Sequence, residues 1–287
     1  MSVSLSIRSV TYRILSHHQK LFRFSKAFAS DKRSDTNVFD RLTKRRQRNW
    51  AASQSDHSVY DYLKEEVAYR VSDRIYDVKK FMNVGVDLGC GFGYIAPHIY
   101  KEHVGCFIQA DMSENMVVAS RRSEEVNTFR VVGDEETVPF RNNFADLIVS
   151  ANSMHWINDL PGFLRGIFSA LREDGVFIGG IFGGDTLFQL RCSVQLAEME
   201  RLGGLAPHVS PFVTPEDVSN LMQNTGFGLI TIDVDEIIVN YPDVFALMYD
   251  LKGMAESAAA WIRAKTIRRD VLNAAAAIYR VNMTEND

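Results

Sequence analysis

Short apolar runs and segments of helical periodicity alternate along the middle of the chain. Apolar residues recur at steps of three and four over residues 60–78 and 160–171, which predicts amphipathic helices, and a short helix is expected over 94–100. Runs typical of buried strands begin at Val84 and cover residues 107–110, 129–132, 145–150 and 176–182. Strands that alternate with helices predict an α/β fold with a parallel, doubly wound sheet over residues 84–182.

The chain after residue 182 is predicted to be mainly helical. Helices are expected over residues 187–200, from Thr214 to Gly226, and in two stretches after Pro242, the second over 258–279. Thr214 and Asp217 form a capping-box pattern at the start of the second of these helices. The remaining expectations are two β-like stretches within residues 229–240 and a frayed end over 281–287.

One strand leads directly into a glycine turn, in the stretch VGVDLGCGFG. Gly89, Gly91 and Gly93 alternate with other residues, and Asp87 lies two residues before the first of them. Such a turn lets backbone N–H groups approach a ligand closely. A dinucleotide site has the spacing G-x-G-x-x-G, whereas here the third glycine comes one residue early. Asp111 ends the next strand, where an acid accepts hydrogen bonds from a ribose diol, although a turn role is the alternative.

Charge is distributed unevenly along the chain. The first 30 residues contain five Lys or Arg, seven Ser and no acid, which predicts a mitochondrial transit peptide, with a disordered basic tail as the alternative. Without that segment the net charge of −4 becomes −9 (−4 − 5), which argues against a nucleic-acid binder. The three cysteines are isolated, so neither a disulfide framework nor a zinc site is indicated. No apolar run reaches the length of about eighteen residues that a membrane span needs.

Residues 31–56 are polar and carry a basic cluster close to a tryptophan. The cluster consists of Lys44, Arg45, Arg46 and Arg48, and the tryptophan is Trp50. We interpret it as a solvated face, with a lid over an acidic ligand as the alternative. The expected organisation is a transit peptide over 1–30, a helical lid over 31–82, and a main domain over 83–287 with a helical insertion near 184–212.

The glycine turn and its acids together resemble the first motif of class I S-adenosylmethionine-dependent methyltransferases. The resemblance implies that the turn wraps the methionine and ribose of the cofactor, and that Asp87 holds its amino end or orders the turn. Asp111 would take the ribose hydroxyls and Asp134 would face the adenine. The implied cofactor-binding set is Asp87, Gly89, Gly91, Gly93, Asp111, Met112, Asp134 and Glu135.

A more specific resemblance extends over about residues 37–280. The segments NVFDRLTKRRQRNWAA, YDYLKEEVAYRVSDRIYDV, SMHWINDLP, GVFIGGIFGGDTLFQLRCSVQLAEMER, PHVSPF and VDEIIVNYPDVF are similar to the mitochondrial complex I assembly factor 5 family, which is related to methyltransferases of bacterial biotin synthesis. The resemblance implies a matrix protein, peripheral to the inner membrane, that hydroxylates an arginine of an iron–sulfur subunit early in complex I assembly. A small stabilising assembly factor is a further candidate partner.

A hydroxylase must activate oxygen, and a metal-based one commonly uses two His and one carboxylate around iron. His155 and His208 lie in loops that are expected to face the cleft, with Asp159 and Asp185 nearby in sequence. They make iron a candidate cofactor, but nothing in the sequence fixes their separation, so the metal ligands stay unassigned. The alternative is that His155 and Trp156 form a wall of the substrate pocket and that His208 bonds its own loop.

A substrate arginine needs carboxylates in bidentate geometry. Asp185, Glu198 and Glu200 are candidates, and Asp185 is the best placed because it follows a strand end and a glycine pair. We interpret Glu198 and Glu200 as parts of an ordinary solvated helix face. The candidate catalytic set is therefore His155, Asp185 and His208.

The resemblance also implies a final antiparallel strand that closes the sheet beyond the last helix. No apolar β-like run follows Tyr279, so we expect this strand to be missing and one sheet edge to be open. Three functions stay open: a protein-arginine hydroxylase, an S-adenosylmethionine-dependent methyltransferase, and a non-catalytic assembly chaperone.

Overall fold

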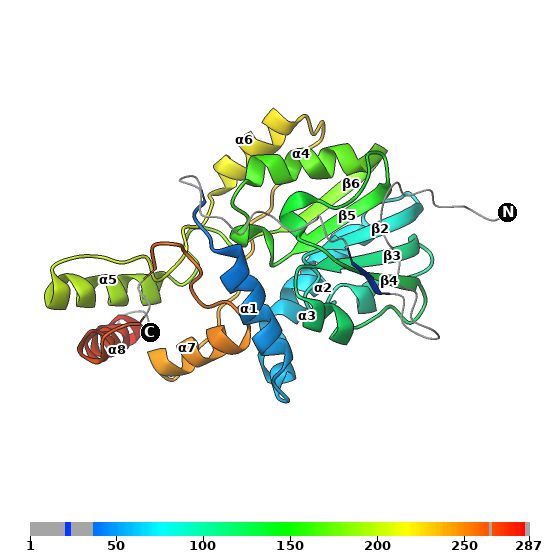
Figure 1. Cartoon of the computed structure of the whole chain (residues 1–287). Helices are drawn as coiled ribbons and strands as arrows, with labels where there is room; N and C mark the ends of the chain where they lie inside the picture. The colour runs from blue at the N-terminus through cyan, green and yellow to red at the C-terminus, as the bar shows by residue number, and fades with distance from the viewer. Residues whose placement is uncertain (1–20, 24–36, 264–265, 285–287) are drawn as a thin grey trace.

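The computed structural model describes residues 21–23, 37–263 and 266–284. In this part of the chain, six parallel strands form one sheet with the order β1-β4-β3-β2-β5-β6, and helices cover both of its faces (Figure 1). The strands are β1 Leu21–Arg23, β2 Met82–Leu88, β3 Val104–Asp111, β4 Asn127–Val132, β5 Ala145–Ala151 and β6 Leu171–Gly180. The helices are α1 Arg41–Ala52, α2 Tyr62–Tyr76, α3 Glu114–Ala119, α4 Leu160–Ala170, α5 Phe188–Leu202, α6 Pro215–Thr225, α7 Val244–Gly253 and α8 Arg269–Thr284. The prediction of a doubly wound α/β fold is confirmed.

The central strands β2 and β5 are buried on both faces, as expected for the middle of a parallel sheet. One apolar cluster includes Ile75 of α2 together with Phe107 and Leu147. A second cluster joins Ile148 to Phe163 of α4. All strands run in the same direction, so their carboxyl ends share one edge of the sheet, where open α/β sheets bind ligands.

Two local predictions around the second strand need correction. The α-helix expected over residues 94–100 is wrong, since the structure has only a short 3₁₀ turn at Ala96–His98. Pro97 lacks a backbone N–H, which explains why the apolar residues pack here without extending into an α-helix. The sequence reading also missed α3, which Ser113 caps by accepting a hydrogen bond from Met116 N at 3.2 Å.

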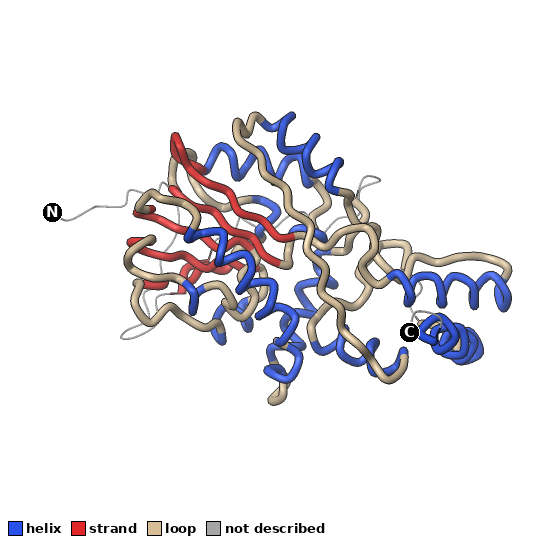
Figure 2. The backbone as a smooth tube through the Cα atoms, turned by 180° about the vertical axis from the view of Figure 1, so that it is seen from behind, coloured by secondary structure: helices blue, strands red, loops and turns tan. Residues whose placement is uncertain are grey.

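The β-like stretches expected over residues 229–240 are wrong, because this segment forms neither strand nor helix. Figure 2 shows it within the long connection from α6 to α7. Asp233 forms an ion pair with Arg74 of α2, so polar contacts to a helix replace pairing with a strand. Among the described residues, β6 is therefore the outer strand on its side of the sheet.

The C-terminal helices form a smaller unit beside the sheet (Figure 1). Helix α8 packs against both α5 and α7, around apolar side chains that include Val194, Leu247 and Ala275. Helix α8 begins later than expected, at Arg269, and continues to Thr284 instead of fraying from residue 281. The capping box at the start of α6 is confirmed.

Most of the expected transit peptide lies outside the described residues. Only Leu21–Arg23 is described within residues 1–30, and it adds a parallel strand to the edge of the sheet beside β4. Among the helices of the described residues, none combines the length and the apolar character needed to cross a membrane.

Candidate functional site

The glycine turn follows β2 directly, and all three of its glycines have a positive φ. A Cβ atom added to Gly89 would lie 2.3 Å from the Ser153 side chain, and one added to Gly93 would lie 2.2 Å from Gln109 Nε2. These two glycines are therefore required by packing within the protein. At Gly91 the nearest atom to an added Cβ is a ring carbon of Tyr94, 3.6 Å away. Gly91 thus presents backbone that a ligand can approach.

Asp87 lies at the end of β2, beneath this turn. Its side chain is buried, and neither carboxylate oxygen has a hydrogen-bond partner among the described residues. Burial, reinforced by the nearby charge of Asp111, raises the pKa of Asp87 well above its usual value. A buried acid without a donor is costly, and it is the kind of group that a ligand amine would satisfy.

Asp111 ends β3 and is fully buried next to the turn. Its Oδ1 accepts a hydrogen bond from Ser113 N at 2.7 Å, and its Oδ2 accepts one from Gly91 N at 3.0 Å. The guanidinium of Arg48 donates to the same Oδ2 at 3.1 Å. Met112, which follows Asp111, is also buried. The predicted ribose acid and the glycine turn are therefore in direct contact.

Asp134 and Glu135 follow β4 and contact a second arginine. Arg41 binds Asp134, and its Nη2 lies 3.0 Å from Glu135 Oε1. Glu135 Oε1 also accepts hydrogen bonds from Arg48 at 2.9 Å and from the Ser153 hydroxyl at 2.8 Å. Burial alone would raise the pKa of Glu135, but Arg41 and Arg48 outweigh it and lower that pKa to about 2. Glu135 is therefore ionised at neutral pH.

Helix α1 supplies these arginines from one face, which also carries Lys44. Arg41, Lys44 and Arg48 are spaced three and four residues apart, so they share a helix face, and all three are buried. The interpretation of the basic cluster as a solvated face is wrong for Lys44 and Arg48, although Arg46 is indeed exposed. The spacing was the signal that could have predicted this burial, because it places three cations on one helix face. Arg41 and Arg48 contact the acids at the strand ends, and Lys44 contacts the segment after α7.

A second cluster surrounds Glu256, in the segment after α7. His155 Nε2 lies 3.2 Å from Glu256 Oε2, and Trp156 Nε1 donates to the same oxygen at 2.6 Å. Lys64 pairs with the other oxygen at 3.0 Å, and Lys44 Nζ lies 3.3 Å from the centre of the Trp156 ring. Burial lowers the pKa of His155, although Glu256 partly opposes that shift, which favours a neutral imidazole. No sequence signal indicated Glu256.

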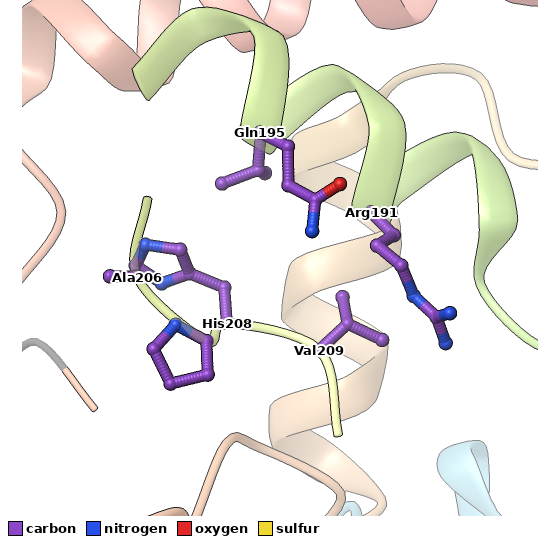
Figure 3. Close-up of a pocket in the computed structure, with 7 residues that line it drawn as sticks. Arg191, Gln195, Ala206, His208 and Val209 are labelled. Carbon is purple, nitrogen blue, oxygen red and sulfur yellow. The ribbon is translucent and has the colours of Figure 1, made fainter. Parts of the chain in front are cut away.

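His208 lies in the loop after α5, beside that helix (Figure 3). Its Nε2 lies 2.6 Å from Glu198 Oε1, while Glu198 Oε2 accepts a hydrogen bond from Ala206 N at 2.8 Å. The interpretation of Glu198 as part of a solvated face is wrong, because it is buried and holds this loop. The exposed Glu200 agrees with that interpretation. His208 bonds α5 and not its own loop, contrary to the alternative role considered above.

The candidate catalytic residues do not form a metal site in the described part of the chain. His155 and His208 contact different carboxylates, Glu256 and Glu198. Asp185 is exposed in the turn before α5. Across the described ranges, no group of three or more His, Cys, Asp or Glu side chains is placed to hold a metal ion. The donor set therefore does not fit iron.

The turn and the strand ends do fit an adenosylated cofactor. The partnerless carboxyl of Asp87 and the open approach at Gly91 both lie beside Asp111, at the carboxyl edge of the sheet. Sequence reasoning identified these residues from their spacing. It missed Arg41, Arg48 and Ser153, which hold the acids in place.

Comparisons with known proteins find similarity to methyltransferases. The family model of a methyltransferase domain matches residues 86–179. A malonyl-[acyl-carrier protein] O-methyltransferase of Xylella fastidiosa is 30% identical over 224 residues, covering 76% of this chain and 74% of its own length. A solved S-adenosylmethionine-dependent methyltransferase of Leishmania major has a TM-score of 0.47 and 13% identity, covering 64% of this chain and 73% of that one.

Similarity is much stronger to proteins named arginine-hydroxylase NDUFAF5, mitochondrial. The human protein of that name is 52% identical over 244 residues, which cover 85% of this chain and 70% of the human one. An identity of this size over most of both chains identifies the family. The chain belongs to the family of mitochondrial arginine hydroxylases named NDUFAF5.

Proposed function

We propose that this chain is a mitochondrial protein-arginine hydroxylase that acts on an iron–sulfur subunit during assembly of respiratory complex I. The observation that carries this proposal is the 52% identity to the human arginine hydroxylase over 85% of this chain. Because the match covers 85% of the chain, it includes the glycine turn and the acidic strand ends. Matrix location, peripheral attachment to the inner membrane and a small stabilising partner belong to the same proposal.

The proposed cofactor of the glycine turn is S-adenosylmethionine. Its amino group would bind the partnerless carboxyl of Asp87, and its ribose diol would bind Asp111. When bound, this cofactor supplies an activated methyl group. The fold excludes water from the acids, since Asp111 and Glu135 are fully buried, and Arg41 and Arg48 hold the charge of Glu135.

Asp185 is the proposed contact for the guanidinium of the substrate. It follows the end of β6 and lies exposed, and no atom lies within 4 Å of a Cβ built on the preceding Gly183 or Gly184. A carboxylate in open surroundings can take an arginine in bidentate geometry. His155 stands at the neighbouring strand end, where its Nδ1 is buried and has no hydrogen-bond partner among the described residues.

The second candidate function is methyl transfer. It is favoured by the match of residues 86–179 to a methyltransferase domain and by the fit of Asp87 and Gly91 to the cofactor. A methyltransferase needs little catalytic machinery beyond alignment and desolvation of the acceptor. The same residues would therefore be sufficient for that chemistry.

Mass spectrometry of the purified iron–sulfur subunit, from cells with and without this protein, separates the candidates. A gain of one oxygen atom on an arginine supports hydroxylation, and a gain of one CH₂ group supports methylation. An unchanged subunit whose assembly still requires the protein supports a non-catalytic chaperone and refutes both enzymes. Asp185→Asn should reduce modification of the subunit. The matched control is Glu200→Gln, which removes a solvent-facing carboxylate and should leave the modification unchanged.

A further inference from the structure

The guanidinium of Arg48 binds the same carboxylate, Asp111, to which the proposed function assigns the cofactor ribose. Arg48 Nη1 is 3.1 Å from Asp111 Oδ2, and both side chains are buried. The same Nη1 is 2.9 Å from Glu135 Oε1, and Nη2 donates to the Ser153 hydroxyl at 3.1 Å. Arg48 therefore links the ribose acid to the next strand end.

The hydrogen bonds that Asp111 already accepts leave too few acceptor positions for a ribose diol. A carboxylate offers about four acceptor positions. Ser113 N, Gly91 N and Arg48 already donate to Asp111, so one position is left. A ribose diol that donates from both hydroxyls needs two. The two backbone donors are fixed by the chain, so Arg48 is the donor that has to leave.

We propose that Arg48 is a specificity-determining residue of the cofactor site, a guanidinium that must be displaced from Asp111 by a vicinal diol before the cofactor binds. The proposal rests on the proposed cofactor site. In this proposal, Arg48 selects which ligands bind. A ligand without the diol has no pair of hydroxyl donors to replace the guanidinium on Asp111. The backbone donors from Gly91 and Ser113 stay in place in both states.

The surrounding contacts allow this exchange without removing α1 from the cleft. After leaving Asp111, Arg48 keeps Glu135 and Ser153 as partners. Arg41 independently neutralises Asp134 and Glu135, so the acids of β4 do not lose their cation. Lys44 anchors the middle of the helix through a hydrogen bond of 2.8 Å to Ala255 O. The displacement is thus a movement of one side chain.

Calorimetric titration with adenosine, 2′,3′-dideoxyadenosine and S-adenosylmethionine tests the proposal on the full chain. Arg48→Met removes the guanidinium and keeps an unbranched apolar stem. We expect it to bind adenosine and S-adenosylmethionine at least about tenfold more tightly than the wild type, because a charged hydrogen bond no longer has to be broken. Dideoxyadenosine, which has no diol, should show no gain. The exposed Arg46→Met, on the opposite side of α1, should bind all three ligands as the wild type does.

Arg48→Lys gives a second test that keeps the buried charge, in case the methionine variant does not fold. A lysine pairs as a point charge and cannot form the guanidinium fork, so it should be easier to displace from Asp111. The Arg48→Lys variant should therefore bind adenosine more tightly than the wild type. Equal or weaker binding by the folded Arg48 variants, while the wild type binds, would overturn the inference and leave the cofactor site standing. An equal gain with dideoxyadenosine would overturn it too. If neither the wild type nor any folded variant binds S-adenosylmethionine, both the inference and the cofactor site fail.

Discussion

Replacing Glu135 with glutamine tests whether the buried arginines of α1 stabilise the fold through this carboxylate. Arg41 and Arg48 lie 3.0 and 2.9 Å from Glu135 Oε1, and they lower its pKa from 4.5 to about 2. One pKa unit corresponds to about 1.4 kcal/mol, so the ionised carboxylate contributes about 3 kcal/mol at pH 7. The pKa of Glu135 is lower in the folded state than in the unfolded state. Its contribution to stability is therefore complete when the pH is above the unfolded-state pKa, and it is lost as the pH falls toward the folded-state pKa.

The assay is urea unfolding of the wild type and of Glu135→Gln between pH 7 and pH 3. The ionised carboxylate of Glu135 should make the wild type more stable than Glu135→Gln by about 3 kcal/mol at pH 7. At pH 3 this part of the difference in unfolding free energy should be about half as large, about 1.4 kcal/mol. Titrating groups that do not interact with Glu135 behave alike in both proteins and cancel from the difference. Glu200→Gln is the control, because that exposed pair with Arg201 should change stability by less than about 1 kcal/mol. A difference that stays constant over this pH range would refute the reasoning.

Three other changes have distinct expected outcomes. Asp87→Asn should raise the melting temperature, and its advantage over the wild type should grow from pH 5 to pH 8, because the raised pKa of Asp87 makes its ionised form unfavourable in the folded state. Gly91→Ala should lower the unfolding free energy by only about 1–2 kcal/mol, because residue 91 has a left-handed φ, but it should weaken S-adenosylmethionine binding. Gly93→Ala should not fold, because its Cβ would clash with neighbouring atoms. Lys44→Met should lower the unfolding free energy by about 2 kcal/mol, because the buried carbonyl of Ala255 and the partly buried carbonyl of Ser257 lose their donor, while Arg46→Met should be neutral. Stable Gly93→Ala protein, or equal effects of the last two variants, would contradict these expectations.

Five strands of the described sheet, β2 to β6, were predictable because a buried parallel strand is a short apolar run; β1 was not predicted, because Leu21–Arg23 lies in the segment assigned to a transit peptide. The errors came from residues whose state depends on context. Pro97 limited an apparently helical segment to a single turn. The apolar character of residues 229–240 suggested strands, but a strand forms only where a neighbour supplies backbone partners.

At the candidate site, the glycines and the acids were predictable because their spacing reflects the local path of the chain from strand to turn. The partners of those acids were not. Arg48 lies 63 residues from Asp111, and Trp156 lies 100 residues from Glu256. Whether a charged residue on a helix faces solvent or an acid depends on how that helix docks. Composition alone favoured solvent for the basic face of α1.

The contacts of α1 also constrain the order in which the chain can complete its folding. Lys44 bonds Ala255 across 211 residues, and Asp40 pairs with Arg263 across 223. Helix α1 is synthesised early, but it cannot complete these contacts until residue 263 has emerged. Contacts so distant in sequence close slowly, because the entropy of a long loop must be lost first. Full docking of α1 is therefore a late folding step, and until then the acids at the strand ends lack part of their neutralising charge.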